Sequence, residues 1–454
     1  MSTATGMAEL AMGRVRFGIV AMLCVVTVVN YADRATLSIA GPVMAKDLGL
    51  TPIGMGYVFS AFGWSYVIAQ IPGGWLLDRF GSKRVYFASI FTWSLFTLLQ
   101  GGVWVFSAVT AVYALFALRF LVGAAEAPSF PANGRIVAAW FPAGERGTAS
   151  ALFNAAQYFA TALFAPIMGW ITVTYGWPAV FVVMGVLGIA VSAVWLKVVH
   201  SPGHHPRLGT LERDYMREGG ALVDLDGPGA PPRGRRASTS GADFDAMLAL
   251  LRDRMMVGIF VGQFCINAIT YFFITWFPVY LVQQRHMGIL NAGFVAAIPA
   301  ICGFAGGVVG GTWSDALLRR GHSLTFARKL PLVLGMLVSM CMILCNYVEA
   351  QWLVVAIMAV SFFGKGIGAL GWAVLSDTAP REIAGLSGGL FNMCGNVSSI
   401  TTPIVIGYII GITGSYDGAL VFVGLNALAA AVSYLVIVKD IHRLELHRPQ
   451  PAAH

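Results

Sequence analysis

Long apolar segments recur along this chain of 454 residues and are separated by short polar turns. A helix needs about 20 consecutive apolar residues to cross the hydrocarbon core of a bilayer. The pattern therefore predicts an all-α membrane protein with twelve spanning helices, six on each side of a longer polar segment. We expect the spans at residues 15–39, 53–77, 84–105, 107–133, 147–172, 175–198, 255–283, 288–317, 329–348, 351–375, 384–412 and 415–438.

The longer polar segment divides the chain. Its GPGAPPRGRRASTSG run (Gly227–Gly241) is typical of a flexible linker. The following DFDAMLALLRDRM (Asp243–Met255) predicts a short amphipathic helix that leads into the seventh span. We expect an N-terminal six-helix half at 1–199, a cytoplasmic linker at 200–242, a C-terminal six-helix half at 243–440 and a cytoplasmic tail at 441–454.

The two halves repeat short motifs at matching positions. GGWLLD (Gly73–Asp78) follows the second span and GGTWSD (Gly310–Asp315) follows the eighth. ALFN (Ala151–Asn154) in the fifth span matches GLFN (Gly389–Asn392) in the eleventh. Two parallel repeats of six spans are typical of secondary transporters, whose binding site lies near the bilayer midplane.

Composition and charge agree with this architecture. The chain is 57% hydrophobic and only 11% charged, whereas soluble domains carry about 25% charged residues. Of its 29 Lys and Arg residues, only Lys46 and Arg285 fall in predicted outer loops, and only Arg34, Arg119 and Lys365 fall within spans. This positive-inside bias predicts a multi-pass protein of the inner membrane with both termini cytoplasmic. It also accounts for the net charge of +8 without a nucleic-acid partner.

Charged residues inside the predicted spans are the first functional candidates. An acid and a base stand side by side in NYADRATLSIA (Asn30–Ala40) as Asp33 and Arg34, and Arg119 and Glu126 lie two helical turns apart in the fourth span. A charge at the bilayer centre costs about 2.5–3.5 kcal/mol on insertion scales, and such residues mark substrate or proton pathways. Neighbours on a helix point about 100° apart, so Asp33 and Arg34 are each expected to have another partner. Asp33 and Glu126 are candidate proton carriers, and Arg119 is either structural or functional.

Lys365 and several polar stripes complete the candidate set. Lys365 lies in FFGKGIG (Phe362–Gly368), either deep in the tenth span or snorkelling to its outer end. Span seven carries Gln263, Asn267, Tyr271 and Thr275 on one face, and spans two, five and eleven carry similar stripes. Such stripes either make interhelical hydrogen bonds or line a polar cavity. Amides and phenols suit a ligand rich in hydroxyl groups. The six cysteines lie in apolar segments without metal-ligand spacing, so no metal or other cofactor is expected.

Several motifs resemble a known family. GGWLLDRFGSKR (Gly73–Arg84) resembles the cytoplasmic loop signature of the major facilitator superfamily. NYADR and RFLVGAAEAPSFPANGRIVAAWFP (Arg119–Pro142) resemble its anion:cation symporter branch. Together with these motifs, bacterial glucarate/galactarate transporters are closely resembled by FSAFGWSY, FFGKGIGALGWAVLSDTAP and FNMCGNVSSITTPIVIGY. This resemblance covers nearly the whole chain except the termini and the linker. The resemblance implies the major facilitator fold of two six-helix halves and proton-coupled import of a sugar diacid by alternating access.

The resemblance also implies roles for individual residues. Asp33 and Glu126 would handle protons, Arg34 would bind a substrate carboxylate, and protonation of Asp33 would free Arg34 to do so. The residues implied to line the sugar-acid site are Tyr66, Gln157, Trp372 and Asn392, with Tyr31 as a further candidate beside Gln263 and Asn267 of the polar stripe. The loop-signature residues implied to gate the conformational change are Asp78 and Arg79, with Asp315 and Arg319 as their counterparts in the second half.

A hexarate carries a carboxylate at each end and so needs a second cation, for which Lys365 is the hypothesis. Alternatives are a carrier of galactonate, another hexonate or a tartrate-like diacid, and a membrane sensor that binds a sugar acid without carrying it. An exporter is disfavoured by the cationic residues in the predicted cavity. An enzyme is disfavoured because no Ser/His/Asp, metal or phosphate-loop constellation is present. The expected partners are a sugar-acid anion, protons and membrane lipid, and we expect a monomer.

Overall fold

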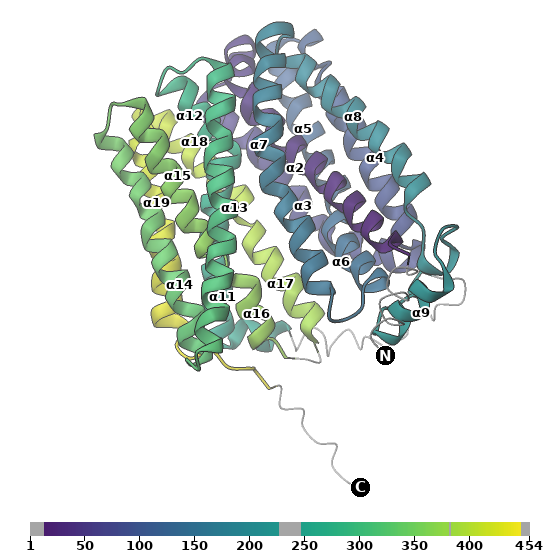
Figure 1. Cartoon of the computed structure of the whole chain (residues 1–454). Coiled ribbons are helices and arrows are strands. Elements are labelled where there is room, and N and C mark those ends of the chain that lie inside the picture. Colours follow the sequence, from purple (N-terminus) through teal and green to yellow (C-terminus); the bar gives the residue numbers. More distant parts are fainter. Residues whose placement is uncertain (1–12, 227–246, 381–382, 446–454) are drawn as a thin grey trace. The chain divides into compact units, whose positions relative to one another are not determined.

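The computed structural model of the chain describes residues 13–226, 247–380 and 383–445, and every regular element within these residues is a helix (Figure 1). Eleven helical segments of the described residues are long and apolar enough to cross a membrane. Helix α3 (Pro52–Phe80), 29 residues long, covers the remaining predicted span at 53–77. The twelve-helix prediction is confirmed.

The chain divides into two compact units. Among the described residues, the first contains 13–50 and 61–226, and the second contains 51–60, 247–380 and 383–445, so that the first residues of α3 group with the second unit. The other helices of the first unit are α2 (Val15–Leu48), α4 (Ser82–Gln100), α5 (Ala108–Glu126), α6 (Ser129–Trp140), α7 (Arg146–Tyr175), α8 (Trp177–Val198) and α9 (Thr210–Glu218). The helices of the second unit are α11 (Arg254–Thr275), α12 (Phe277–Gln283), α13 (Ile289–Arg319), α14 (Leu324–Ser339), η4 (Met340–Tyr347), α15 (Gln351–Ile367), α16 (Gly371–Thr378), α17 (Ala384–Asn396), α18 (Ser398–Thr413), α19 (Asp417–Val432) and η6 (Ser433–Ile437).

Several predicted single spans are broken helices. The predicted span 107–133 consists of α5 and α6, which meet at Ala127 and Pro128, and 351–375 consists of α15 and α16, separated by Gly368–Leu370. Proline removes a backbone donor and glycine offers no side-chain support, so both favour such breaks. In transporters, interrupted helices concentrate where they line a cavity. One break directly follows Glu126, and the other lies just beyond Lys365.

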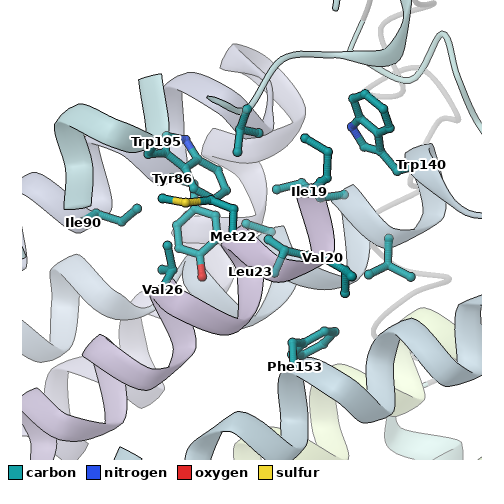
Figure 2. Packing of buried hydrophobic residues seen from close by; sticks show 14 of the residues in the cluster. Ile19, Val20, Met22, Leu23, Val26, Tyr86, Ile90, Trp140, Phe153 and Trp195 are labelled. Carbon is teal, nitrogen blue, oxygen red and sulfur yellow. The ribbon is translucent and has the colours of Figure 1, made fainter. Parts of the chain in front are cut away.

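The core of the first unit holds α2 in place. Met22 and Val26 of α2 pack in one cluster with Tyr86 of α4 and Trp195 of α8 (Figure 2). The rings of Tyr86 and Trp195 meet edge to face with centroids 4.6 Å apart. Asp33 lies two turns beyond Val26 on the same helix, so this packing fixes the part of α2 that presents the charged pair.

The polar segment after α8 is folded against the first unit as far as Asp226. Glu212 of α9 is fully buried and accepts hydrogen bonds from the backbone N–H groups of Val15 (3.1 Å) and Arg16 (3.2 Å) and from the Arg16 guanidinium (3.2 Å). Helix α2 has no acidic residue in its first turn and no side-chain cap of its own. The carboxylate of α9 therefore caps the first turn of α2, beside which α9 lies in Figure 1.

Asp226 caps a second helix in the same way. Helix α4 starts after Gly81, whose φ of 80° lies in the left-handed region and which offers no capping side chain. Asp226 Oδ2 accepts the backbone N–H of Ser82 at 3.1 Å. The segment between α8 and Asp226 is therefore part of the folded unit, which its polar sequence did not predict.

Two of the histidines at the start of this segment, His200 and His205, take part in packing. The His205 ring lies 5.3 Å from Trp140 and 5.5 Å from His200. Burial, and secondarily the neighbouring His200, lower the pKa of His205, which keeps the ring neutral at physiological pH. The predicted flexible run Gly227–Gly241 lies outside the described residues. Residues 247–252 are helical, and Asp253 ends that helix and caps α11 by accepting the N–H of Met256 at 2.9 Å.

Candidate functional site

Four charged side chains of the first unit, two from the middle of α2 and two from the second half of α5, form two ion pairs. Arg34 of α2 contacts Glu126 of α5, with its Nε and Nη2 each 2.9 Å from Glu126 Oε2. Arg119 of α5 lies 3.9 Å from Asp33 Oδ2 and donates a hydrogen bond to the backbone carbonyl of Arg34 at 3.1 Å. All four side chains are at least 93% buried. We call Asp33, Arg34, Arg119 and Glu126 the four-charge cluster.

The pairing corrects one expectation. Protonation of Asp33 was expected to free Arg34, but the carboxylate in contact with Arg34 belongs to Glu126. Asp33 instead contacts Arg119 and accepts a hydrogen bond from Thr97 Oγ1 at 3.0 Å. The cause is the 100° rotation between successive helix residues, which directs the two side chains of the pair at different partners.

Aromatic rings surround the Arg34 guanidinium. The rings of Tyr31, Phe62 and Tyr66 have centroids 4.9, 4.6 and 5.0 Å from Arg34 Cζ. Cation–π contacts of this kind stabilise a guanidinium away from water and leave its edge available for carboxylates. The structure therefore brings the candidates Tyr31 and Tyr66 to the arginine they were expected to accompany.

The cluster is electrically neutral as long as both acids are ionised. The pair Asp33–Arg119 is loose, and Glu126 Oε1 is buried without a hydrogen-bond partner among the described residues. A proton added to either acid leaves one positive charge uncompensated in a region of low dielectric. Such a charge is lowered in free energy by an incoming anion. The arrangement is suited to exchanging a proton for a bound carboxylate.

The second unit presents amides instead of acids. Gln263 donates to Asn267 (3.2 Å) along α11, and Tyr271 of the same helix donates to Asn396 Oδ1 of α17 (2.7 Å). Asn396 in turn donates to Asn392 Oδ1 at 3.0 Å. A side chain at Gly395 would lie 2.8 Å from Asn267 Nδ2, so this glycine allows the close approach of α17 to α11. We call Gln263, Asn267, Asn392 and Asn396 the amide face.

Lys365 is buried near the end of α15. Its side chain is 6% exposed, which argues against a lysine that snorkels to the membrane surface. The ammonium lies 5.1 Å from the ring centroid of Phe362, one turn earlier on the same face. Phe362 packs on Phe273 of α11, with centroids 4.3 Å apart. Lys365 therefore lies on the face of α15 that is turned toward α11.

Two other predicted site residues, Trp372 and Gln157, are less buried than the four-charge cluster. The Trp372 indole meets Phe391 edge to face at 4.8 Å and is 53% exposed, so it borders open space near the amide face. Gln157 is half-buried and donates to the Asn154 carbonyl of its own helix α7 at 2.8 Å. Helix α7 packs along α2, but no contact joins Gln157 to the four-charge cluster among the interactions described.

The loop-signature residues contact arginines that sequence reasoning missed. Asp78 contacts Arg135 of α6, which also binds Asp226, and Asp315 contacts Arg328 of α14, which also binds Asp377. Arg79 packs over Trp75 and Phe80. In the sequence, Arg135 and Arg328 are basic residues near helix ends. The positive-inside distribution already accounted for such residues, so neither was singled out as a functional candidate. A cavity of about 640 Å³ borders the first group.

Within residues 13–226, 247–380 and 383–445, no three His, Cys, Asp or Glu side chains gather as metal ligands would.

Comparison with known proteins places this chain among transporters. Residues 23–328 match the family model of the Major Facilitator Superfamily. The chain is 63% identical over 431 residues to the probable galactarate/D-glucarate transporter GudP of Escherichia coli K12, with 95% of each chain covered. It is 39% identical over 432 residues to the D-galactonate transporter of Escherichia coli O6:H1, with 95% of this chain and 97% of that one covered. The xylose transporter XylE from E. coli shares the fold at a TM-score of 0.67 and 15% identity, with 93% of this chain and 96% of that one covered.

Proposed function

Because this chain belongs to the Major Facilitator Superfamily of membrane transporters, we propose that it imports a sugar diacid of the D-glucarate or galactarate type together with protons, by alternating access across the inner membrane. The 63% identity to a protein named for these two substrates supports the substrate class. The positive-inside distribution of basic residues supports an orientation with both termini in the cytoplasm.

The observation that carries the proposal is the ion pair between Arg34 and Glu126 inside the four-charge cluster. Arg34 is the cation for a substrate carboxylate, and Glu126 competes with the substrate for it. Protonation of Glu126 removes the competitor, and Glu126 Oε1 is the buried oxygen that is open to a proton. Proton binding and anion binding therefore favour each other at this arginine, which is the requirement for symport.

Asp33 is proposed as the second proton carrier. Its partner Arg119 is fixed to the backbone of Arg34, so charge changes at Asp33 act on the same segment of α2. A diacid anion enters against a negative interior, at about 2.3 kcal/mol per charge per 100 mV. Protons on both acids offset this electrical cost, since each proton carries one positive charge inward.

Lys365 is proposed to bind the second carboxylate, and the amide face is proposed to bind the hydroxyl groups of the sugar acid. A buried ammonium supplies a point charge for the carboxylate. Amide side chains both donate and accept, as a polyol requires. Asp78, Arg79 and Asp315 are proposed to gate the cytoplasmic side.

The second candidate is a hexonate carrier, which the 39% identity to the D-galactonate transporter favours. Uptake of radiolabelled D-glucarate into proteoliposomes under an imposed inward proton gradient separates the two functions. We expect accumulation that a protonophore abolishes and that unlabelled galactarate inhibits more strongly than galactonate. Accumulation of galactonate with no uptake of glucarate would contradict the diacid assignment and leave the hexonate carrier.

A further inference from the structure

Lys365 follows a glycine that lies directly against the neighbouring helix α14. A Cβ atom at Gly364 would lie 2.6 Å from the backbone oxygen of Gly335 and 2.9 Å from the backbone nitrogen of Ser339. Ser361, three residues before Gly364, donates a hydrogen bond to the Ser339 carbonyl at 2.8 Å, and both serines are fully buried. The backbone of α15 therefore meets the backbone of α14 just before Lys365, with no room for a methyl group between them.

The glycine after Lys365 makes the corresponding contact with α13. A Cβ atom at Gly366 would overlap the backbone oxygen of Gly303, and one at Gly306 would overlap the backbone oxygen of Phe363. Backbone atoms cannot turn aside as the end of a flexible side chain can, so either methyl group would force the two helices apart. Helix α15 is thus held between α14 and α13 at the two positions that flank Lys365.

These contacts determine the direction of the Lys365 side chain. Successive residues of a helix are rotated by about 100°, so Gly364 and Gly366 point to either side of Lys365. With α14 against the first glycine and α13 against the second, Lys365 lies in the sector between them, which is turned toward α11. Phe362 occupies the same sector and packs on Phe273 of α11, with ring centroids 4.3 Å apart. Because Lys365 is 6% exposed, its charge is held inside the second unit.

The chain beyond Lys365 is attached to the amide face. Helix α15 ends at Ile367, and α16 begins at Gly371. A Cβ atom at Gly371 would overlap Oε1 of Gln263 and lie 2.9 Å from the ring of Phe391. The short segment from Lys365 to Gly371 therefore contacts α13 and α14 at one end and the amide face at the other. Glycine contacts at both ends set the spacing between Lys365 and the amides.

We propose that Gly364 and Gly366 are positioning residues that hold Lys365 at a fixed spacing from the amide face, so that the second unit selects sugar diacids by the distance between their carboxylate and hydroxyl groups. This inference rests on the proposed function, since it takes Lys365 as the cation for the second carboxylate. Lysine has a flexible four-carbon stem, and a mobile ammonium would follow the carboxylate of a shorter diacid. An ammonium that is held in place favours ligands of one length, because only they reach it without giving up a hydroxyl contact.

The experiment measures the affinities of D-glucarate, the shorter diacid tartrate and the monoacid galactonate by competition binding in wild type, Gly366→Ala, Gly306→Ala and Gly307→Ala. Gly307 is the matched control, since it follows Gly306 on α13 but a Cβ atom there would lie 4.0 Å from the nearest atom of a neighbouring helix. We expect wild type to prefer glucarate to tartrate about tenfold or more. Gly366→Ala and Gly306→Ala lower the glucarate affinity about tenfold and change the other two affinities less than about twofold, whereas Gly307→Ala equals wild type.

The decisive variant is the double substitution Lys365→Gln/Gly366→Ala. If Gly366 acts through Lys365, adding Gly366→Ala to Lys365→Gln lowers the glucarate affinity no further, so the two changes are strongly non-additive. A purely structural role of Gly366 predicts additive losses, and losses of equal size for all three ligands, and either result would overturn the proposal. An undiminished preference for glucarate over tartrate in Gly366→Ala would overturn it as well.

If Gly366→Ala does not fold, Ser361→Ala provides a milder comparison, since it removes the hydrogen bond to Ser339 without adding an overlap. We then expect a loss of about threefold that is restricted to glucarate. A glucarate affinity that falls in Lys365→Gln but in neither positioning variant overturns the positioning role and leaves the proposed function standing. A glucarate affinity that is unchanged in Lys365→Gln contradicts the proposed binding of the second carboxylate and overturns the positioning role with it.

Discussion

The two units of the molecule differ in the kind of polar side chain that they place in their interiors. Besides Arg16 and Glu212 at the start of α2, the first unit buries four charged side chains in two ion pairs, whereas the second unit presents the half-buried amides and one buried amide of the amide face, and one buried lysine. A neutral hydrogen-bonded amide costs little to keep and does not respond to pH. A cluster of acids and bases is costly but changes its net charge with each proton. From this contrast we propose that proton coupling belongs to the first unit and recognition of hydroxyl groups to the second.

Arg34→Ala is the change with the largest expected effect on this comparison. It removes the proposed carboxylate-binding cation and leaves Glu126 buried without its partner. Losing one member of a buried charge pair costs about 2–5 kcal/mol, so we expect glucarate binding to weaken about 30-fold or more. Isothermal titration calorimetry in detergent measures this, with Arg34→Lys as the control that keeps the charge and loses the fork. Binding unchanged in Arg34→Ala would remove the first unit from substrate recognition.

Glu126→Gln separates binding from coupling. The amide imitates the protonated acid, so Arg34 is permanently available to the substrate. In wild type, affinity is expected to rise about tenfold for each pH unit of acidification over the range in which the acid titrates, because binding takes up a proton. We expect the affinity of Glu126→Gln to depend less steeply on pH than that of wild type, since only Asp33 remains to take up a proton. We also expect this variant to exchange substrate across the membrane and to accumulate less of it against a gradient. Undiminished proton-driven accumulation would assign coupling to other groups.

Lys365→Gln tests whether the second unit contributes a charge to recognition. A diacid loses one of its two cationic contacts, whereas a monoacid held by Arg34 loses none. We expect glucarate affinity to fall about tenfold or more and galactonate affinity to change less than twofold, since a charge-assisted contact contributes about 1.5–3 kcal/mol. Competition binding with both ligands measures the ratio, and Lys365→Arg is the charge-preserving control. Equal effects on both acids would make Lys365 structural.

Asn267→Ala has the smallest expected effect. It removes one neutral partner of Gln263 and leaves every charge in place. A single neutral hydrogen bond contributes about 0.5–1.5 kcal/mol, so KM is expected to rise about threefold to tenfold for glucarate and galactonate alike. Uptake kinetics with both acids at two pH values check this. A changed pH dependence would show that the amide face takes part in proton coupling after all.

The sequence was sufficient for the number and order of the spans because hydropathy responds directly to the bilayer. It also identified Asp33, Arg34 and Glu126 as unusual, since intramembrane charges stand out against an apolar background. The pairing of Arg34 with Glu126 was not predictable, because it depends on how α2 is rotated against α5. Residues such as Arg135 and Arg328 were missed because a basic residue near a helix end is already explained by topology.

The helix breaks and the folded segment before Asp226 were missed for a related reason. A broken helix such as α5–α6 keeps the hydropathy of a continuous one, so the period of the pattern does not reveal the break. In the segment 200–226, most residues are polar, and the segment is attached through two carboxylates that are sheltered from water only against the helix ends they cap. Composition shows how polar a segment is, but it does not show which backbone N–H groups its carboxylates will accept hydrogen bonds from.

The capping of α2 by Glu212 and of α4 by Asp226 determines where the protein can be divided into two fragments that are expressed separately. A fragment that stopped at the end of α8 would leave the first turns of two membrane helices without the carboxylates that complete them. When the two parts are expressed from separate open reading frames, a first fragment that continues through Asp226 is expected to complement its partner more efficiently.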